Sequence, residues 1–312
     1  MKSKIGIISV FVAALVTGIF WLAPDSRLEK GMVIVTAVPS GIDLINDDLG
    51  VDHRYFPGSQ ILALKTDAGN DNTEPVLLSE GFYSARAPEV SYDGEKMVFS
   101  GQKEKGDTWQ IFTMDLKSFK VKQITEGSEH CTDPAWMPDG RIAFSKLTND
   151  KIAGPLHRLF ACEPEGEGIV QLTYSPNSSI ASSIFQDGRI LVLDEQKYPE
   201  KGKRKLMAMR IDGTISELFY ENTGSKEVLG KGWEAGKEVY FIERESEHPH
   251  KTSLASVKQG HPLSSYMNLS EDIPGTFNSV SSGQEGTLLV SYKKENDGAF
   301  GLHIFDPQKP EL

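Results

Sequence analysis

The chain has 312 residues, a length that fits one large all-β domain or two ordinary domains. With 38% hydrophobic and 25% charged residues, its composition is that of a folded globular protein and excludes a disordered one. The formal net charge of -11 argues against nucleic-acid binding, which depends on Lys and Arg neutralising phosphates. Two cysteines, with no CxxC or CxxCH spacing, exclude a disulfide framework, a zinc knuckle and a covalently attached c-type haem.

The N-terminus predicts a membrane signal. Residues Ile5 to Ala23 carry no charge and follow Lys2 and Lys4. At about 1.5 Å rise per residue this run spans roughly 28 Å, close to the hydrocarbon core of a bilayer. We favour an uncleaved transmembrane helix with its basic flank in the cytoplasm; a cleaved signal peptide is the alternative. Either one exports the rest, so we divide the chain into an anchor and linker (residues 1–30) and an exported domain (residues 31–312).

A turn element recurs through the exported domain. A glycine preceded by Asp, Ala or Glu separates two short apolar runs five times, at intervals of 46, 48, 48 and 50 residues: Gly94, Gly140, Gly188, Gly236 and Gly286. We interpret each as a two-residue hairpin turn in which glycine supplies a positive φ. Each turn is followed by further strand-like segments, of which the first are residues 109–116, 157–164, 205–212, 252–259 and 301–307.

Each copy therefore predicts four short strands, and no segment after the anchor has sustained helical spacing. Four antiparallel strands at this period are typical of a β-propeller blade, because one such sheet cannot bury both of its faces alone. Ahead of the first turn, residues 32–38, 59–65 and 75–81 predict the second, third and fourth strands of another blade, with an enlarged loop at 41–58. We predict an all-β fold with six four-stranded blades; in an alternative closure, residues 33–38 complete the last unit as its outer strand.

The two best-preserved repeats resemble those of the TolB-type periplasmic propellers. That family repeats a P-x-[WF]-S-P-D-G-x-x-[IL]-x-F strand pair, then an I-Y-x-[MV]-D strand and an x-[LI]-T strand. The matching residues are Pro88, Asp93, Gly94, Phe99, Ile111, Met114, Asp115 and Thr125 in one unit, and Pro134, Trp136, Pro138, Asp139, Gly140, Phe144, Leu172 and Thr173 in the next. Residues 85–100 and 133–145 also resemble the propeller region of the hydrazine synthase alpha subunit. The resemblance implies a propeller; it does not imply hydrazine chemistry, which needs c-type haem.

The loops that join one blade to the next are where propellers commonly bind partners. Four residues of these loops are our candidates for ligand binding: Tyr83, Arg86, His130 and Asp133. The segment 129–133 offers carboxylate, imidazole and thiolate groups, which are metal ligands, but a turn-capping Asp133 beside a buried cysteine is the favoured interpretation. We therefore predict no metal and no cofactor.

Three other features have simple interpretations. Glu245, Glu247, His248 and His250 form a charged loop that we expect to be solvated, with metal binding as the alternative. The basic run from Lys197 to Lys205 is expected to be a mobile loop, with an acidic partner or lipid headgroups as the alternative. The repeat places Cys131 and Cys162 on non-adjacent strands, so we do not expect them to pair.

No catalytic machinery is evident. There is no GxSxG elbow, and none of the histidines lies in a recognisable triad context. We predict a non-enzymatic, monomeric propeller on the periplasmic or cell-surface side of a membrane that binds a protein, peptide or glycan through its loop rim. A glycan-active hydrolase with acids from separate blades, or a truncated accessory form of a larger redox-associated propeller protein, remain alternatives.

Overall fold

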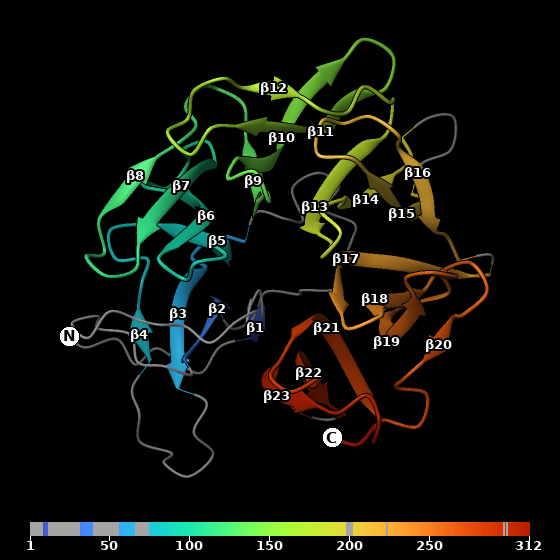
Figure 1. Ribbon diagram of the computed structural model, residues 1–312. Helices are drawn as coiled ribbons and strands as arrows, with labels where there is room; N and C mark the ends of the chain where they lie inside the picture. Colours follow the sequence, from blue (N-terminus) through green and yellow to red (C-terminus); the bar gives the residue numbers. More distant parts are fainter. Residues whose placement is uncertain are drawn as a thin grey trace.

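The computed structural model describes residues 9–11, 32–39, 56–65, 75–197, 202–222, 224–295, 297 and 299–312. Six antiparallel sheets follow one another around a central axis (Figure 1), which confirms the predicted six-bladed propeller. Blade 1 contains β1 (Ser9–Phe11), β2 (Met32–Val38), β3 (Gln60–Lys65) and β4 (Val76–Leu77), and blade 2 contains β5 (Ser84–Val90), β6 (Lys96–Gln102), β7 (Gln110–Asp115) and β8 (Val121–Gln123). Blade 3 contains β9 (Cys131–Trp136), β10 (Ile142–Asp150), β11 (Gly154–Cys162) and β12 (Val170–Gln171), and blade 4 contains β13 (Ser178–Ile184), β14 (Ile190–Glu195), β15 (Arg204–Met209) and β16 (Glu217–Tyr220). Blade 5 contains β17 (Lys226–Ala235), β18 (Glu238–Glu245), β19 (His248–Lys258) and β20 (Met267–Asn268), and blade 6 contains β21 (Gly275–Ser282), β22 (Leu288–Lys294) and β23 (Gly301–Phe305).

The recurring turns join the first and second strands of blades 2 to 6, and all five glycines have the predicted positive φ. The predicted two-residue length is wrong where the sequence is Asp-Gly. At Gly140, for example, the hairpin is closed by Met137 N–H donating to Arg141 O (2.8 Å), which leaves three residues in the loop. Asp139 explains the extra residue, because its Oδ1 accepts the Arg141 N–H (3.2 Å) beyond the glycine. The predicted two-residue length is correct at Gly236, where Ala235 pairs directly with Glu238. In the Gly286 copy, both Glu285 and Gly286 have positive φ and the Thr287 N–H donates to Gln284 O (2.9 Å).

A repeated contact, which we call the hydroxyl clamp, joins the third strand of a blade to the segment that ends its fourth strand. In blade 2 the Ile111 N–H donates to Thr125 Oγ1 (2.9 Å), and the Ile124 N–H donates to Ile111 O (2.8 Å). The same pair of bonds occurs in three other blades: at Ile61 in blade 1 from Leu78-Ser79, at Leu159 in blade 3 from Leu172-Thr173, and at Leu254 in blade 5 from Leu269-Ser270. The recurring aliphatic–Ser/Thr pair in the sequence is therefore a backbone-satisfying device.

Replacing Thr125 with valine tests the clamp. Because Thr125 is buried, the change leaves the Ile111 N–H without an acceptor, and we expect the free energy of unfolding to fall by about 1–3 kcal/mol. Thr125→Ser keeps the hydroxyl and should recover most of the loss in urea unfolding. A stable Thr125→Val variant beside a destabilised Thr125→Ser variant would show that the methyl group, not the hydroxyl, matters.

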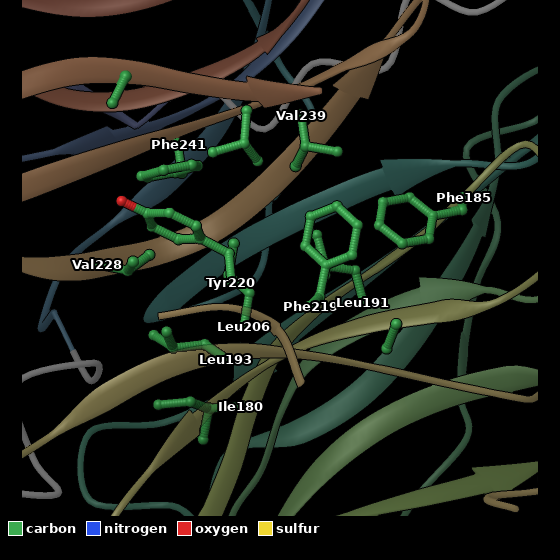
Figure 2. Close-up of a cluster of buried hydrophobic side chains, with 13 residues drawn as sticks. Ile180, Phe185, Leu191, Leu193, Leu206, Phe219, Tyr220, Val228, Val239 and Phe241 are labelled. Carbon is green, nitrogen blue, oxygen red and sulfur yellow. The ribbon is translucent and has the colours of Figure 1, made fainter. Parts of the chain in front are cut away.

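Each of the six contacts between neighbouring blades contains a cluster of buried apolar side chains among the described residues. Figure 2 shows the one between blades 4 and 5, where Tyr220 packs on Phe241 with ring centroids 4.9 Å apart. Cys131 and Cys162 belong to the cluster between blades 2 and 3. Both are free, as expected, and burial raises the pKa of Cys131 to about 11 and that of Cys162 to about 12.

Blade 1 begins within the segment predicted to span a membrane. Ser9–Phe11 form β1, which pairs antiparallel with β2, while the other residues of the 5–23 segment lie outside the described part of the chain. Among the residues described, no helix is long and apolar enough to cross a bilayer. The strands β2, β3 and β4 are the second, third and fourth strands predicted for this blade, and most of the predicted 41–58 loop is outside the described residues.

The ring is closed by packing between blades 1 and 6. Val33 and Val35 of β2 are buried against Leu289 of β22. The alternative in which residues 33–38 complete the last unit is wrong, because β2 pairs with β1 and β3 in blade 1. The β2 segment is buried along nearly its whole length, which suits a strand covered on both faces better than an outer edge.

Truncating Leu289 should open the ring at this contact. We expect Leu289→Ala to lower the free energy of unfolding by about 2–5 kcal/mol because it leaves a cavity. Amide exchange should accelerate in β2, β3, β22 and β23 before it does in blade 3. Leu193→Ala, in the cluster between blades 4 and 5, is the matched control and should leave the blade 1–blade 6 contact protected. A uniform acceleration in both variants would contradict closure by packing.

Candidate functional site

The first strands of blades 2 to 6, which lie nearest the axis, all contain a register shift against their second strands. In β5 and β9 the irregular residues Ala87 and Asp133 have φ of 50° and 51°, a conformation that is strained for residues other than glycine. Their N–H groups are satisfied across the blade boundary, by Thr36 Oγ1 (3.2 Å) and Ser100 Oγ (3.1 Å) respectively. Bulges of this kind re-aim side chains and are common next to functional sites.

Two of the four predicted ligand-binding residues meet at these bulges. Arg86 on β5 forms an ion pair with Asp133 on β9, with Nη2 and Oδ1 3.7 Å apart, and both side chains are largely buried. The Arg86 guanidinium also lies 5.4 Å from the centre of the Phe56 ring. Both residues belong to first strands, so their predicted place in the blade-connecting loops is wrong. The charged side chains interrupted the strand pattern and made the segments look like loops.

The other two candidates immediately precede these strands. Tyr83 is held by its backbone N–H, which donates to Gln102 O (2.9 Å). The Nδ1 of His130 accepts the Trp109 N–H (3.1 Å), which fixes the imidazole at the start of β9. The structure thus groups the four candidates in blades 2 and 3, and their role in ligand binding stays a prediction.

An ion pair that sequence analysis missed crosses the axis. Lys231, in the bulge of β17, contacts the buried carboxylate of Glu89 on β5, and these strands belong to opposite blades of the ring. The other Glu89 oxygen accepts the Trp136 N–H (2.9 Å) from blade 3, and the Lys231 ammonium lies 4.7 Å from the centre of the Trp233 ring. This contact links blades 2, 3 and 5 across the centre of the ring.

Breaking the axial pair should be costly. In Lys231→Met the Glu89 carboxylate stays buried without its cation, so we expect the free energy of unfolding to fall by about 2–4 kcal/mol. This loss is somewhat smaller than for a fully buried pair, because Lys231 is partly exposed. The double variant Glu89→Gln/Lys231→Met should regain most of the loss in urea unfolding. A double variant as unstable as the single one would show that Lys231 acts through its packing on Trp233.

Blade 4 holds two buried acids at the end of β14 that faces the blade-connecting loops, which we call the connecting rim. Glu195 contacts Lys197 and Arg204, the latter at 3.3 Å, and Asp194 lies 3.9 Å from Lys205. Burial raises the pKa of Asp194, which an amide hydrogen bond from Asn177 partly offsets. Among its described residues, the basic run 197–205 therefore neutralises its own blade, which was not predicted; residues 198–201 lie outside the described part.

Blade 5 has an equivalent cluster around Glu243, which is fully buried. Its Oε1 accepts hydrogen bonds from Lys226 Nζ (2.6 Å) and Tyr266 OH (2.5 Å), and Asn222 Nδ2 lies 3.4 Å from Oε2. Burial, with the Glu243 carboxylate beside it, raises the pKa of the Tyr266 hydroxyl well above its usual range. The tyrosine therefore stays protonated and acts as a donor, so this carboxylate is satisfied on both oxygens.

The segments considered for metal binding do not converge. Glu129 pairs with Lys146 (3.6 Å), and Asp133 pairs with Arg86. Glu245 contacts His248 (3.6 Å) and Lys251 (3.0 Å) at an exposed hairpin, as expected for solvated charge. Within the described ranges, no group of three or more His, Cys, Asp or Glu side chains could hold a metal ion.

The connecting rim of blade 3 exposes two large hydrophobic side chains. Ile152, at the tip of the β10–β11 hairpin, is 80% exposed, and Tyr174, in the β12–β13 connection, is 74% exposed. Arg158 ties the two loops together, because its guanidinium donates to Ser175 O (3.0 Å) and Asp150 Oδ2 (2.8 Å). Neither side chain was predicted as a site residue, although an isoleucine within a polar hairpin tip is a usable signal.

Comparison with known proteins supports the fold. No protein-family model matches the chain, and no curated protein sequence matches it significantly. Among solved structures, the hydrazine synthase of Kuenenia stuttgartiensis superposes with a TM-score of 0.72 at 18% identity, over 91% of this chain and 44% of that one. TolB from Acinetobacter baumannii gives a TM-score of 0.51 at 15% identity, over 76% of this chain and 51% of that one. The acylaminoacyl peptidase of Pyrococcus horikoshii gives 0.55 at 14% identity, over 90% and 44%.

These comparisons confirm the predicted resemblance to TolB-type and hydrazine synthase propellers at the level of fold. The chain spans less than half the length of the hydrazine synthase chain that it matches. At such low sequence identity, the shared fold does not imply that this chain has the synthase or the peptidase activity.

Proposed function

We propose that the protein is a non-enzymatic binding module that holds a protein, peptide or glycan partner at its connecting rim. The observation that carries this proposal is the exposed pair Ile152 and Tyr174 on loops that Arg158 fixes in place. Large apolar and aromatic side chains on a rigid support are typical anchors of binding interfaces, because little conformational entropy is lost when they are covered. We call this pair with its supporting arginine the rim patch.

The charged groups support binding over catalysis. Glu89, Glu195 and Glu243 are buried, and each contacts a lysine or arginine. A glycan-active hydrolase needs one carboxyl group held protonated as an acid beside a second, ionised one. Each of these three carboxylates is held by its cation, an arrangement that is better suited to stiffening the ring than to proton transfer.

The place of action is also part of the proposal. The uncharged segment 5–23 behind Lys2 and Lys4 favours export with an N-terminal membrane anchor, or secretion after cleavage. In either case residues 9–11 would not occupy β1, and blade 1 would keep β2, β3 and β4. The likeness in fold to TolB supports a periplasmic or cell-surface location. Fractionation of cells that express the full chain tests this, since the protein should enter the membrane fraction and be open to protease from the exported side only.

A capture experiment tests the rim patch. We expect the full chain to capture a reproducible partner from its own envelope fraction. The double variant Ile152→Asp/Tyr174→Ala should capture at least tenfold less of that partner. Leu263→Asp is the matched control, because Leu263 is 64% exposed on the opposite rim, in the β19–β20 turn. Circular dichroism should show that all variants fold.

Two outcomes would overturn the proposal. Equal loss in the control variant would place the partner elsewhere on the ring. Turnover in a glycosidase screen that disappears on substitution of Glu195 or Glu243 would show a hydrolase.

A further inference from the structure

Blade 6 differs from the other five in its outer edge. Among the described residues, β23 is its outermost strand, whereas every other blade has a fourth strand. After β23 the chain turns at the Asp306–Lys309 bridge, and Ile304 on β23 remains 61% exposed. A five-residue edge of this kind is a template for pairing with another strand.

The register of blade 6 identifies the residue that would receive a hydroxyl clamp. Leu302 pairs with Ser291 across β22 and β23. In the same way, Ile111 pairs with Ser100 in blade 2, and Leu159 pairs with Ser145 in blade 3. In those blades the N–H and C=O of Ile111 and Leu159 point away from the second strand and bind the clamp. The backbone groups of Leu302 therefore face the outer edge of blade 6.

We propose that this edge binds an extended segment of a different polypeptide, which pairs antiparallel with β23 and places an aliphatic residue followed by Ser or Thr beside Leu302. The hydroxyl oxygen of the Ser or Thr accepts the Leu302 N–H, and the N–H of the aliphatic residue donates to Leu302 O. The interface continues the third-strand to fourth-strand pairing that the chain already uses in its other blades, so the chain's own clamps define the chemistry of the partner.

A second copy of the chain does not fit this role. The clamps of blades 1, 2, 3 and 5 are each engaged within their own blades. Among the described residues, the strand that would meet this edge in a symmetric pairing of two copies is β23 itself, whose sequence GLHIF contains no hydroxyl side chain. Pairing of β23 with β23 would offer the Leu302 N–H a backbone carbonyl in place of the hydroxyl that blades 1, 2, 3 and 5 supply, so it would not form a clamp.

A peptide copied from the chain's own blade 2 tests the proposal on the full chain. The probe is acetyl-Val-Lys-Gln-Ile-Thr-amide, the sequence of residues 121–125, and the control probe has valine in place of threonine. We expect the probe to slow amide exchange at Leu302 and Ile304 at least tenfold, and the control probe to bind at least fivefold more weakly. No protection in β23 at saturating probe, or equal effects of the two probes, would overturn the proposal.

A variant and a cross-linking experiment identify the natural occupant. Ile304→Lys places a charge on the edge and should weaken probe binding at least tenfold, while Ile152→Lys on the rim patch should leave it unchanged. A photoreactive residue at position 304 should cross-link in envelope extracts to a polypeptide segment that contains an aliphatic–Ser/Thr pair. Cross-linking to a second copy of this chain, or to a segment without such a pair, would contradict the proposed partner.

Discussion

Each four-stranded or three-stranded sheet of this protein has two apolar faces, and exposing either face to water is unfavourable. Each blade must therefore lie between two others, and the structure satisfies this only if the last blade covers the first. Six buried clusters fill the six contacts, and the one formed by Val33, Val35 and Leu289 completes the circle. In many propellers one terminus completes the blade of the other. Among the residues described here, blades 1 and 6 share no strand and meet through their packed faces.

Polar groups are accommodated by a small set of repeated contacts. The hydroxyl clamps satisfy the third strands, and Thr36 and Ser100 satisfy the strained bulges of the next blade. The buried acids Glu89, Glu195 and Glu243 each contact a lysine or an arginine. Such pairs add less to stability than their number suggests, but they hold the surrounding strands in a fixed geometry that a binding surface requires.

The repeat and its strands could be predicted because their signals are local. Glycine at a positive φ, apolar alternation and the aliphatic–Ser/Thr pair each act within one blade, so a single sequence reveals them. The Arg86–Asp133 contact was only half predicted: the residues were chosen, but their charges suggested loops where bulged strands occur.

Contacts between distant segments could not be predicted. Lys231 and Glu89 lie 142 residues apart, and only the closed ring brings opposite blades together. The exposure of Ile152 and Tyr174 depends on how Arg158 holds two loops, which no periodicity records. The strand β1 was hidden because its residues belong to an uncharged run that resembles a membrane segment more strongly than a strand.

Methyl NMR gives the most direct test of ring closure. In a protein labelled at the Val and Leu methyl groups, Val33 and Val35 should show nuclear Overhauser effects to Leu289, because these side chains pack together between blades 1 and 6. The same spectrum should contain effects between Val228 and the leucines of blade 4, which report a contact inside the ring. Effects inside the ring without any between Val35 and Leu289 would contradict a closed six-bladed propeller.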